Sequence, residues 1–481
     1  MYVDFSTRGN PISARDIQHC DVDIGNFLKK NGYAKELVNG NRSVFHHFSS
    51  YSEGIITLPR GSNMSKMSEN LLECGSPRVL SHFISKSPWL AENIMRLNRI
   101  NTVKLLGPGG SLIIDESGQQ KYGTHAVATS KQYLGTVGRT CNAQVEVFGS
   151  YCVGKTSAII DFQVFFTERW ANNTKKSLNC GVPLELLEHR TKPDLALDIV
   201  DRAISDEIPF TYVQADALYG NDSKFLGALE ERGLTFICDI ASDTQVYITE
   251  PELELPKRKG NVGRFPSKLK VKNTSPTKVK WLSEIQKNWK TVDIRLTDRG
   301  IKSVECAELI VWRRHNDLPA EKPVKLIMIR DPEEDFLRFS VSNNLEFDLD
   351  YLVKAQAKRY WIERNFEDVK GLCDLDSFRG RSWTSLNHHI ALCVTAHLFL
   401  LHLKEYFRKK SKILSLNQTV AIVRLRKPLR VFTEQELADL INRTNFIRAK
   451  MRDRRIMKFI QKRYEKENIW STNILEFRTK G

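Results

Sequence analysis

The 481-residue chain is long enough for several packed domains, and 41% of its residues are hydrophobic, which excludes a disordered tail. It has 73 Lys and Arg against 57 Asp and Glu, a net charge of +16. This excess predicts a polyanionic partner, nucleic acid ahead of an anionic membrane. Residues 404–480 hold 21 basic and 8 acidic side chains, so most of the excess lies in the C-terminal segment.

The nine cysteines are scattered and include no Cys-x-x-Cys pair. They predict reduced thiols that fill a core in a cytoplasmic protein, and they argue against a zinc site. The first residues lack the pattern of a secretion signal. The longest apolar run, 391–403, is too short to span a bilayer. We therefore expect a soluble, cytoplasmic protein without a membrane partner.

In chain order, residues 16–100 show helical spacing of apolar residues, which predicts a separate helical region. GPGG at 107–110 then predicts a turn, and SLIID predicts a short buried strand that ends on Asp115. The segments AQVEVFGSYCV and SAIIDFQVFF continue as strands. The chain thus changes from helical to β-rich near residue 107.

One stretch, GSYCVGKT at 149–156, matches the phosphate-binding loop of nucleotide hydrolases. That loop works only between a strand and a helix, whose N-terminus holds the phosphates. The residues after Thr156 are rich in Ile, Val and Phe and predict a second strand. We therefore predict a β-hairpin with Gly154 and Lys155 in its turn, and no nucleotide cofactor.

Further along, 192–205 predicts a helix and TYVQAD predicts a strand ending in Asp216. LTFICDI follows as another strand, and 257–280 then contains nine basic residues and no acid, which is typical of a loop facing nucleic acid. VDIRL, AELIVWRR, VKLIMIRD and LRFSVSN predict a β-rich module inserted into a larger fold.

After this module, LDYLVKAQAKRYWIERNFEDVKGL predicts a helix. Near the C-terminus, Thr433 and Glu436 form a capping box that starts another helix. The basic helix that follows is interpreted either as a solvated charged helix or as a phosphate-facing surface.

Two strand-terminal aspartates, Asp115 and Asp216, become informative together with a third carboxylate. Cleavage of a phosphodiester commonly uses two magnesium ions roughly 4 Å apart, held by several carboxylate oxygens. At about 100° per residue, Glu363 and Lys370 lie within about 40° of Arg359 on one helix face. Such a face could hold metal with the acid and phosphate with the bases. The alternative is a solvated intrahelical ion pair of Arg359 with Glu363.

Neighbouring acids and histidines fit this site less well. Glu116 points to the opposite side of an extended strand from Asp115. Glu367 and Asp368 lie farther around the helix than Glu363. His388 and His389 diverge by about 100° on a helix, so both cannot readily bind one ion; one could line the site, and packing is an equal alternative.

These residues resemble a known family. Asp115 in LIIDES, Asp216 in VQADALYG and Glu363 in RYWIERNFEDVKG are similar to the DDE triad of bacterial insertion-sequence transposases. Arg359, Glu363 and Lys370 match the signature helix, whose usual tyrosine is replaced here by Gln356. KYGTHAVATSKQYLGTVGRTCNAQVEV, TDRGIKS, LDSFRGRSWTSLNHHIALCVTAHLFL and TLPRGSNMSKMSENL are similar to the insertion-sequence family numbered seven-zero-one.

The resemblance implies an α/β fold with a ribonuclease-H-like catalytic core interrupted by a β-rich insertion domain. It further implies the following domains: a helical N-terminal DNA-binding domain at 1–106, the first part of the core at 107–240, the insertion at 241–345, the second part of the core at 346–405, and a basic helical region at 406–481.

The resemblance also implies cut-and-paste DNA transposition, with metal-dependent cleavage at the transposon ends and strand transfer into target DNA. Asp115, Asp216 and Glu363 would be catalytic and would hold two Mg²⁺ ions, for which Mn²⁺ can substitute. Partners would be double-stranded DNA, as terminal inverted repeats and target, and further copies of the chain in a homodimer or higher assembly. The implied DNA-binding residues are Arg359, Lys370, Lys257, Arg258, Lys259, Arg264, Lys268, Lys270, Arg379 and Arg381.

Some alternatives stay open. Trp281, Trp289 and Trp312 are candidates to stack a flipped base, as a tryptophan of the insertion does in related transposases, or else they pack in the core. The whole chain could also be a catalytically silent DNA-binding regulator derived from a transposase, although its intact acids argue against this. A ribonuclease-H-like nuclease would be a third possibility.

Overall fold

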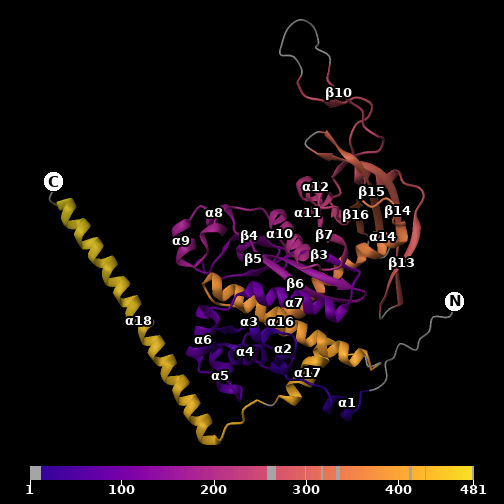
Figure 1. Cartoon of the computed structure of the whole chain (residues 1–481). Helices are drawn as coiled ribbons and strands as arrows, with labels where there is room; N and C mark the ends of the chain where they lie inside the picture. Colours follow the sequence, from indigo (N-terminus) through magenta and orange to yellow (C-terminus); the bar gives the residue numbers. More distant parts are fainter. Residues whose placement is uncertain are drawn as a thin grey trace. The chain divides into compact units, whose positions relative to one another are not determined.

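The computed structural model describes residues 12–256, 267–297, 300–315, 318–331, 336–410, 414–427 and 429–478. The chain forms two compact units, Met1–Ser68 with Glu73–Pro428, and Glu69–Leu72 with Leu429–Gly481. The protein has a mixed α/β fold with one large mixed sheet and many helices (Figure 1).

Residues 12–106 are mainly helical, as the spacing of apolar residues predicts. Ser13, Asp23 and Ser76 each cap a helix by accepting a hydrogen bond from the amide three residues later. The elements are α1 (Ala14–Gln18), α2 (Ile24–Lys30), α3 (Tyr33–Glu36), β1 (Val38–Asn39), β2 (Arg42–Ser43), α4 (Phe45–Thr57), α5 (Met64–Asn70), α6 (Pro77–Lys86) and α7 (Ala91–Leu106).

The core of the first unit is a 12-stranded mixed sheet. Within it, β3 (Gly110–Gln120) pairs antiparallel with β5 (Arg139–Val153) and parallel with β7 (Phe210–Ala215), which pairs parallel with β8 (Phe236–Ile240). On the far side, β5 pairs with β4 (Ser130–Leu134) and with β6 (Thr156–Val164). The connections to β7 and β8 contain α8 (Glu168–Ala171), α9 (Thr174–Asn179), η1 (Leu184–Leu186), α10 (Lys192–Ser205), α11 (Ala217–Gly220) and α12 (Ser223–Glu231).

The strands predicted as an inserted module are present, and they extend this same sheet. β16 (Phe336–Ser342) pairs antiparallel with β8, and β15 (Leu318–Asp331), β14 (Gly300–His315) and β13 (Lys290–Thr297) follow. The remaining elements between β8 and β13 are short. They are β9 (Gln245–Tyr247), β10 (Leu253–Glu254), β11 (Lys270–Val271), β12 (Thr277–Lys278) and α13 (Val279–Ile285).

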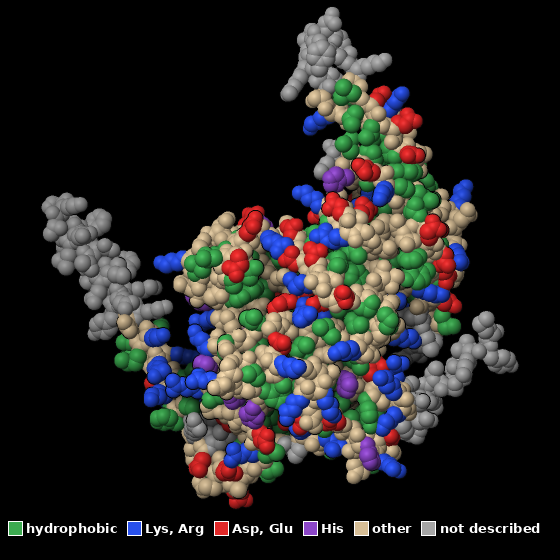
Figure 2. Space-filling view, in the orientation of Figure 1, with side chains coloured by type: hydrophobic (Ala, Val, Ile, Leu, Met, Phe, Trp, Pro, Cys, Tyr) green, Lys and Arg blue, Asp and Glu red, His purple; other side chains and the backbone are tan. Residues whose placement is uncertain are grey.

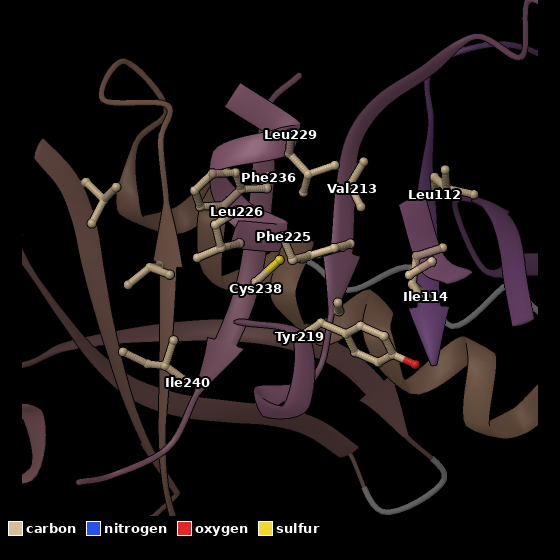
Figure 3. Close-up of a cluster of buried hydrophobic side chains, with 14 of the residues drawn as sticks. Leu112, Ile114, Val213, Tyr219, Phe225, Leu226, Leu229, Phe236, Cys238 and Ile240 are labelled. Atoms are coloured by element: carbon tan, nitrogen blue, oxygen red, sulfur yellow. The ribbon is translucent and has the colours of Figure 1, made fainter. Parts of the chain in front are cut away.

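Helices cover both faces of the central strands. Leu112 and Ile114 of β3 pack with apolar residues of α10, α12, β7 and β8, as Figure 3 shows for part of this cluster. On the other face, Phe148 of β5 contacts Phe366, with ring centroids 5.3 Å apart. Because side chains alternate along a strand, Asp115 faces the second group of helices. These are α14 (Leu349–Gln356), η2 (Ala357–Arg359), α15 (Tyr360–Cys373), α16 (Trp383–Arg408) and α17 (Leu416–Arg426).

The predicted hairpin at GSYCVGKT is confirmed. Val153 pairs with Thr156 across a turn in which Gly154 has φ +60°, a conformation that favours glycine. Gly149 serves packing, because a Cβ there would lie 2.5 Å from Ile199 of α10. The glycines of this motif therefore shape a sheet, and no helix follows the Gly-Lys-Thr sequence.

α16 is long and apolar enough to cross a membrane, but 83% of its most apolar stretch is buried inside the protein, as in a core helix.

In the second unit, α18 (Glu434–Arg478) is one continuous helix of 45 residues. Its capping box is confirmed, since Thr433 and Glu436 exchange backbone-to-side-chain hydrogen bonds.

A buried ion network joins α7 to the sheet. The guanidinium of Arg99, 2% exposed, contacts Asp161 of β6 at 3.0 Å and Asp206 at 2.5 Å. Arg202 of α10 contacts the same Asp161 carboxylate at 2.7 Å. Removing one partner from such a network leaves buried charge without compensation.

We expect Arg99→Leu to lower the free energy of unfolding by about 3 kcal/mol, measured by urea denaturation, because Asp161 and Asp206 would lose a buried counter-ion. The matched control is Arg232→Gln, which removes a partly exposed ion pair with Asp201 and should cost less than about 1 kcal/mol. Equal effects of the two changes would contradict this account.

A buried histidine gives a pH prediction. Among the described residues, neither ring nitrogen of His397 has a hydrogen-bond partner, and burial lowers its pKa to about 3. The unfolded chain takes up a proton below pH 6.5 and the folded chain does not, so stability falls as the pH drops from about 6.5 toward 3. In wild type, His397 lowers the free energy of unfolding by up to about 1.4 kcal/mol for each pH unit in that window. His397→Leu should abolish this contribution.

The measurement is urea denaturation at pH 7, 6 and 5 for wild type, His397→Leu and, as a control, the exposed His82→Leu. Parallel pH curves for wild type and His397→Leu would contradict the prediction.

Candidate active site

Two of the predicted acids lie side by side at the end of a parallel strand pair. Ile114 of β3 is in register with Ala215 of β7, so the next residues are Asp115 and Asp216. The prediction that the first strand ends on Asp115 is wrong, because β3 continues to Gln120 through its antiparallel pairing with β5. Asp216 directly follows β7, and its carboxylate accepts a hydrogen bond from the Leu218 amide at 2.9 Å.

The guanidinium of Arg359 connects Asp115 to the third predicted acid, Glu363. It lies 3.5 Å from the Asp115 carboxylate and 2.9 Å from that of Glu363. Two carboxylates from distant parts of the chain thus contact one guanidinium. The predicted alternative, an intrahelical pair of Arg359 with Glu363, is present as well, but Arg359 is only 14% exposed and also contacts Asp115.

A fourth carboxylate, which the sequence analysis missed, lies at this site. Asp239 is the penultimate residue of β8, and Arg359 Nε donates to it at 3.1 Å. Asp239 also accepts hydrogen bonds from Gln356 Nε2 at 3.0 Å and Ser340 Oγ at 2.6 Å. The same sequence pattern that identifies Asp115 and Asp216 could have identified Asp239, because LTFICDI is a third apolar strand that carries an aspartate near its C-terminal end.

The local backbone explains how Gln356 and Arg359 reach the same carboxylate. The predicted single helix is interrupted by the 3₁₀ turn η2 at Ala357–Arg359, between α14 and α15. In a 3₁₀ helix, side chains three residues apart eclipse each other. Gln356 and Arg359 are therefore aligned on one side, and both bind Asp239. Gln356 is 4% exposed, so this side chain is a buried structural contact.

Electrostatics set Asp115 apart from an ordinary surface acid. Burial and the neighbouring charge of Asp216 raise the pKa of Asp115 to about 7, while Arg359 opposes the shift. Burial and the charge of Glu116 also raise the pKa of Asp216. Buried carboxylates whose pKa values are raised by neighbouring acids form a site that a cation would stabilise.

This donor set fits a divalent cation in part. Asp115 and Asp216 present adjacent carboxylates, and Glu363 is half exposed on the other side of Arg359. Within the described ranges, no three His, Cys, Asp or Glu side chains are close enough together to hold a metal ion. Completing a three-carboxylate site would therefore require Glu363 and Arg359 to rearrange.

The other acids and histidines lie in distinct surroundings. Glu116 points to the α10 face, where it contacts Lys192 at 2.7 Å and Tyr219 at 3.0 Å. Glu367 and Asp368 both pair with Arg364. His388 is buried against Trp89 with ring centroids 3.6 Å apart, and the buried His389 contacts the Asp374 carbonyl at 3.0 Å.

The predicted DNA-binding residues occupy several places. Lys370 of α15 is half-buried and donates to the Gly118 carbonyl at 3.4 Å, whereas Arg379 and Arg381 are exposed in the loop before α16. Lys268 and Lys270 are exposed near β11. Four of the predicted residues lie outside the described residues: Lys257, Arg258, Lys259 and Arg264.

The three tryptophans also differ. Trp281 is 53% exposed, Trp289 carries the Arg330 guanidinium 4.2 Å from its ring centre, and Trp312 is half-buried in β14. Only Trp281 presents a largely open ring among these three.

We expect Asp239→Asn to lower the free energy of unfolding by about 2 kcal/mol, because hydrogen bonds from Arg359 and Gln356 to a charged acceptor become weaker. Urea denaturation measures the effect. Asp350→Asn is the matched control, since that exposed carboxylate pairs with Lys354 on the surface of α14 and should change stability little. A neutral Asp239→Asn would contradict the structural role assigned to Asp239.

Comparisons with known proteins identify the family of this chain. A family model described as DDE superfamily endonuclease matches residues 40–301, which include Asp115 and Asp216. A probable transposase for insertion sequence element IS701 from Microchaete diplosiphon is 34% identical over 174 residues, which are 35% of this chain and 42% of that protein. The matched region thus spans less than half of the relative's length. The family match covers more than half of the chain, and the protein belongs to the DDE superfamily endonucleases.

Proposed function

We propose that this protein is a DNA transposase that cuts the ends of its own insertion sequence and joins them to target DNA. The observation that carries the proposal is the contact of Arg359 with both Asp115 and Glu363, beside Asp216. Family membership and the similarity to the IS701 transposase support it.

The strand order supports a ribonuclease-H-like core. β6, β5 and β3 are antiparallel neighbours, and β7 and β8 continue the sheet in parallel. In this proposal, 107–240 and 346–405 form the core, 241–345 is the insertion, and 1–106 and 406–481 contact DNA. The protein acts in the bacterial cytoplasm as a dimer or larger assembly, because two ends must be joined.

In the proposed reaction, the residues have separate tasks. Asp115, Asp216 and Glu363 would hold two Mg²⁺ ions, with Mn²⁺ able to substitute, and these ions would supply charge neutralisation and activation of the nucleophile. Arg359 and Lys370, on the face that carries Glu363, would hold phosphates of the DNA end. Asp239 orients the Arg359 guanidinium by accepting a hydrogen bond from Arg359 Nε.

We expect Glu363→Gln to reduce cleavage by at least about 100-fold, beyond the range typical of residues that only support a metal ligand. The assay incubates the protein with Mg²⁺ and a plasmid that carries the element's two terminal inverted repeats, and it measures release of the ends. Glu367→Gln on the same helix is the control, since Glu367 pairs with Arg364 on the surface, and it should cleave like wild type.

Different outcomes separate the alternatives. Binding of the repeats without cleavage by wild type would indicate a DNA-binding regulator, and cleavage independent of the end sequence would indicate a general nuclease. Full activity of Glu363→Gln would overturn the assignment of the third acid.

A further inference from the structure

Three hollows on the first unit meet at one arginine. Arg381 lines all three, which have volumes of about 710, 730 and 440 Å³. The first two also share Gly61 and the loop 377–380. Together they form a groove that runs between α5 and α6, the loop after β3, α9 and the loop before α16. We call it the basic groove, defined by Arg60, Lys121, Lys175, Lys176, Arg379 and Arg381.

The charges lining the basic groove are mostly of one sign. Positive and negative side chains are interspersed on the face shown in Figure 2. The groove instead has those six cations and Lys86 against two acids, Asp374 and Asp376. Both acids are engaged, since Asp376 pairs with Arg60 and Asp374 accepts the Gly61 amide at 3.0 Å. Arg379 and Arg381 are exposed and have no ion pair within the described part of the chain.

The groove is held in shape by contacts between its walls. The Val127 amide donates to the Arg381 carbonyl at 3.0 Å, and Lys121 Nζ donates to the Phe378 carbonyl at 2.8 Å. The Trp383 amide donates to the Cys180 carbonyl at 2.8 Å. Because the loop is pinned on both sides, its arginines are presented without a large ordering cost on binding.

Two of the three elements that position the proposed catalytic acids, β3 and α15, lead toward the groove. β3 carries Asp115, and Lys121 follows its last residue, which at roughly 3.3 Å per residue places Lys121 about 20 Å along the strand direction from Asp115. α15 carries Glu363 near its start, and Lys370, seven residues on, donates to the Gly118 carbonyl of β3. Lys370 and Lys121 therefore lie between the proposed catalytic acids and the rest of the basic groove.

We propose that the basic groove binds the phosphate backbone of duplex DNA next to the bond that is cut. At about 3.4 Å per base pair, the 20 Å between Asp115 and Lys121 corresponds to about six base pairs. Phosphate is the ligand because unpaired, preorganised arginines match its geometry. The position along the DNA rests on the proposed function, whereas duplex binding in the groove does not.

The test measures binding of the full chain to a fluorescein-labelled 30-base-pair duplex in EDTA, from 50 to 200 mM KCl. Each lost phosphate contact should reduce the slope of log affinity against log salt by about 0.9, so Arg379→Gln with Arg381→Gln should reduce it by about 2. Lys155→Gln with Lys224→Gln removes the same charge from exposed sites outside the groove and should leave the slope unchanged.

Controls make each outcome decisive. Arg379→Lys with Arg381→Lys keeps the charge and should keep the slope, and thermal melting confirms that the variants fold. A wild-type slope in the Arg→Gln pair, or equal effects of both Gln pairs, would overturn the proposal. A single-stranded RNA of equal length that binds more tightly than the duplex would also overturn it. If the Arg→Gln pair lowers the slope but wild type never cleaves terminal repeats, the proposed function is refuted and the assignment of DNA binding to the basic groove stands.

Discussion

One guanidinium, that of Arg359, lies among carboxylates from three parts of the chain: Asp115 of β3, Asp239 of β8 and Glu363 of α15. Asp115 and Asp239 are largely buried, and like charges this close together repel in a medium of low dielectric constant. Arg359 offsets that repulsion. The arrangement constrains the backbone, because η2 must align Gln356 with Arg359, and α15 must then present Glu363 to the same guanidinium.

Because side chains alternate along β3, the neighbouring acids Asp115 and Glu116 lie on opposite faces of the sheet. Asp115 faces α15, whereas Glu116 faces α10 and is neutralised by Lys192. Among the described residues, Asp115 is left with one ion-pair partner, Arg359, which it shares with other carboxylates. Burial and the charge of Asp216 raise the pKa of Asp115. A second buried network, around Arg99 and Asp161, attaches the N-terminal helices to the sheet. The helices and the sheet thus belong to one compact unit with the site.

Much of the local structure could be predicted because it depends on short-range rules. Alternating apolar residues and a glycine turn predicted the hairpin of β5 and β6, and the helix predicted at 192–205 is α10 at its stated bounds. Two local predictions failed for long-range reasons. β3 extends beyond Asp115 because β5 supplies hydrogen-bond partners to Gln120. The helix around Arg359 is interrupted where Asp239, 120 residues earlier, binds both Gln356 and Arg359.

By itself, the sequence determined the chemical types of the site: strand-associated aspartates, a glutamate between two cations on a helix, and a positive excess suited to a polyanion. These features follow from residue identity and periodicity, which are local. Only the tertiary structure decided that β14 to β16 extend the central sheet, that Asp239 joins the site, and that separate loops meet at Arg381. Those outcomes depend on strand order and on contacts between residues more than 100 positions apart, and neither is encoded in any short stretch of the chain.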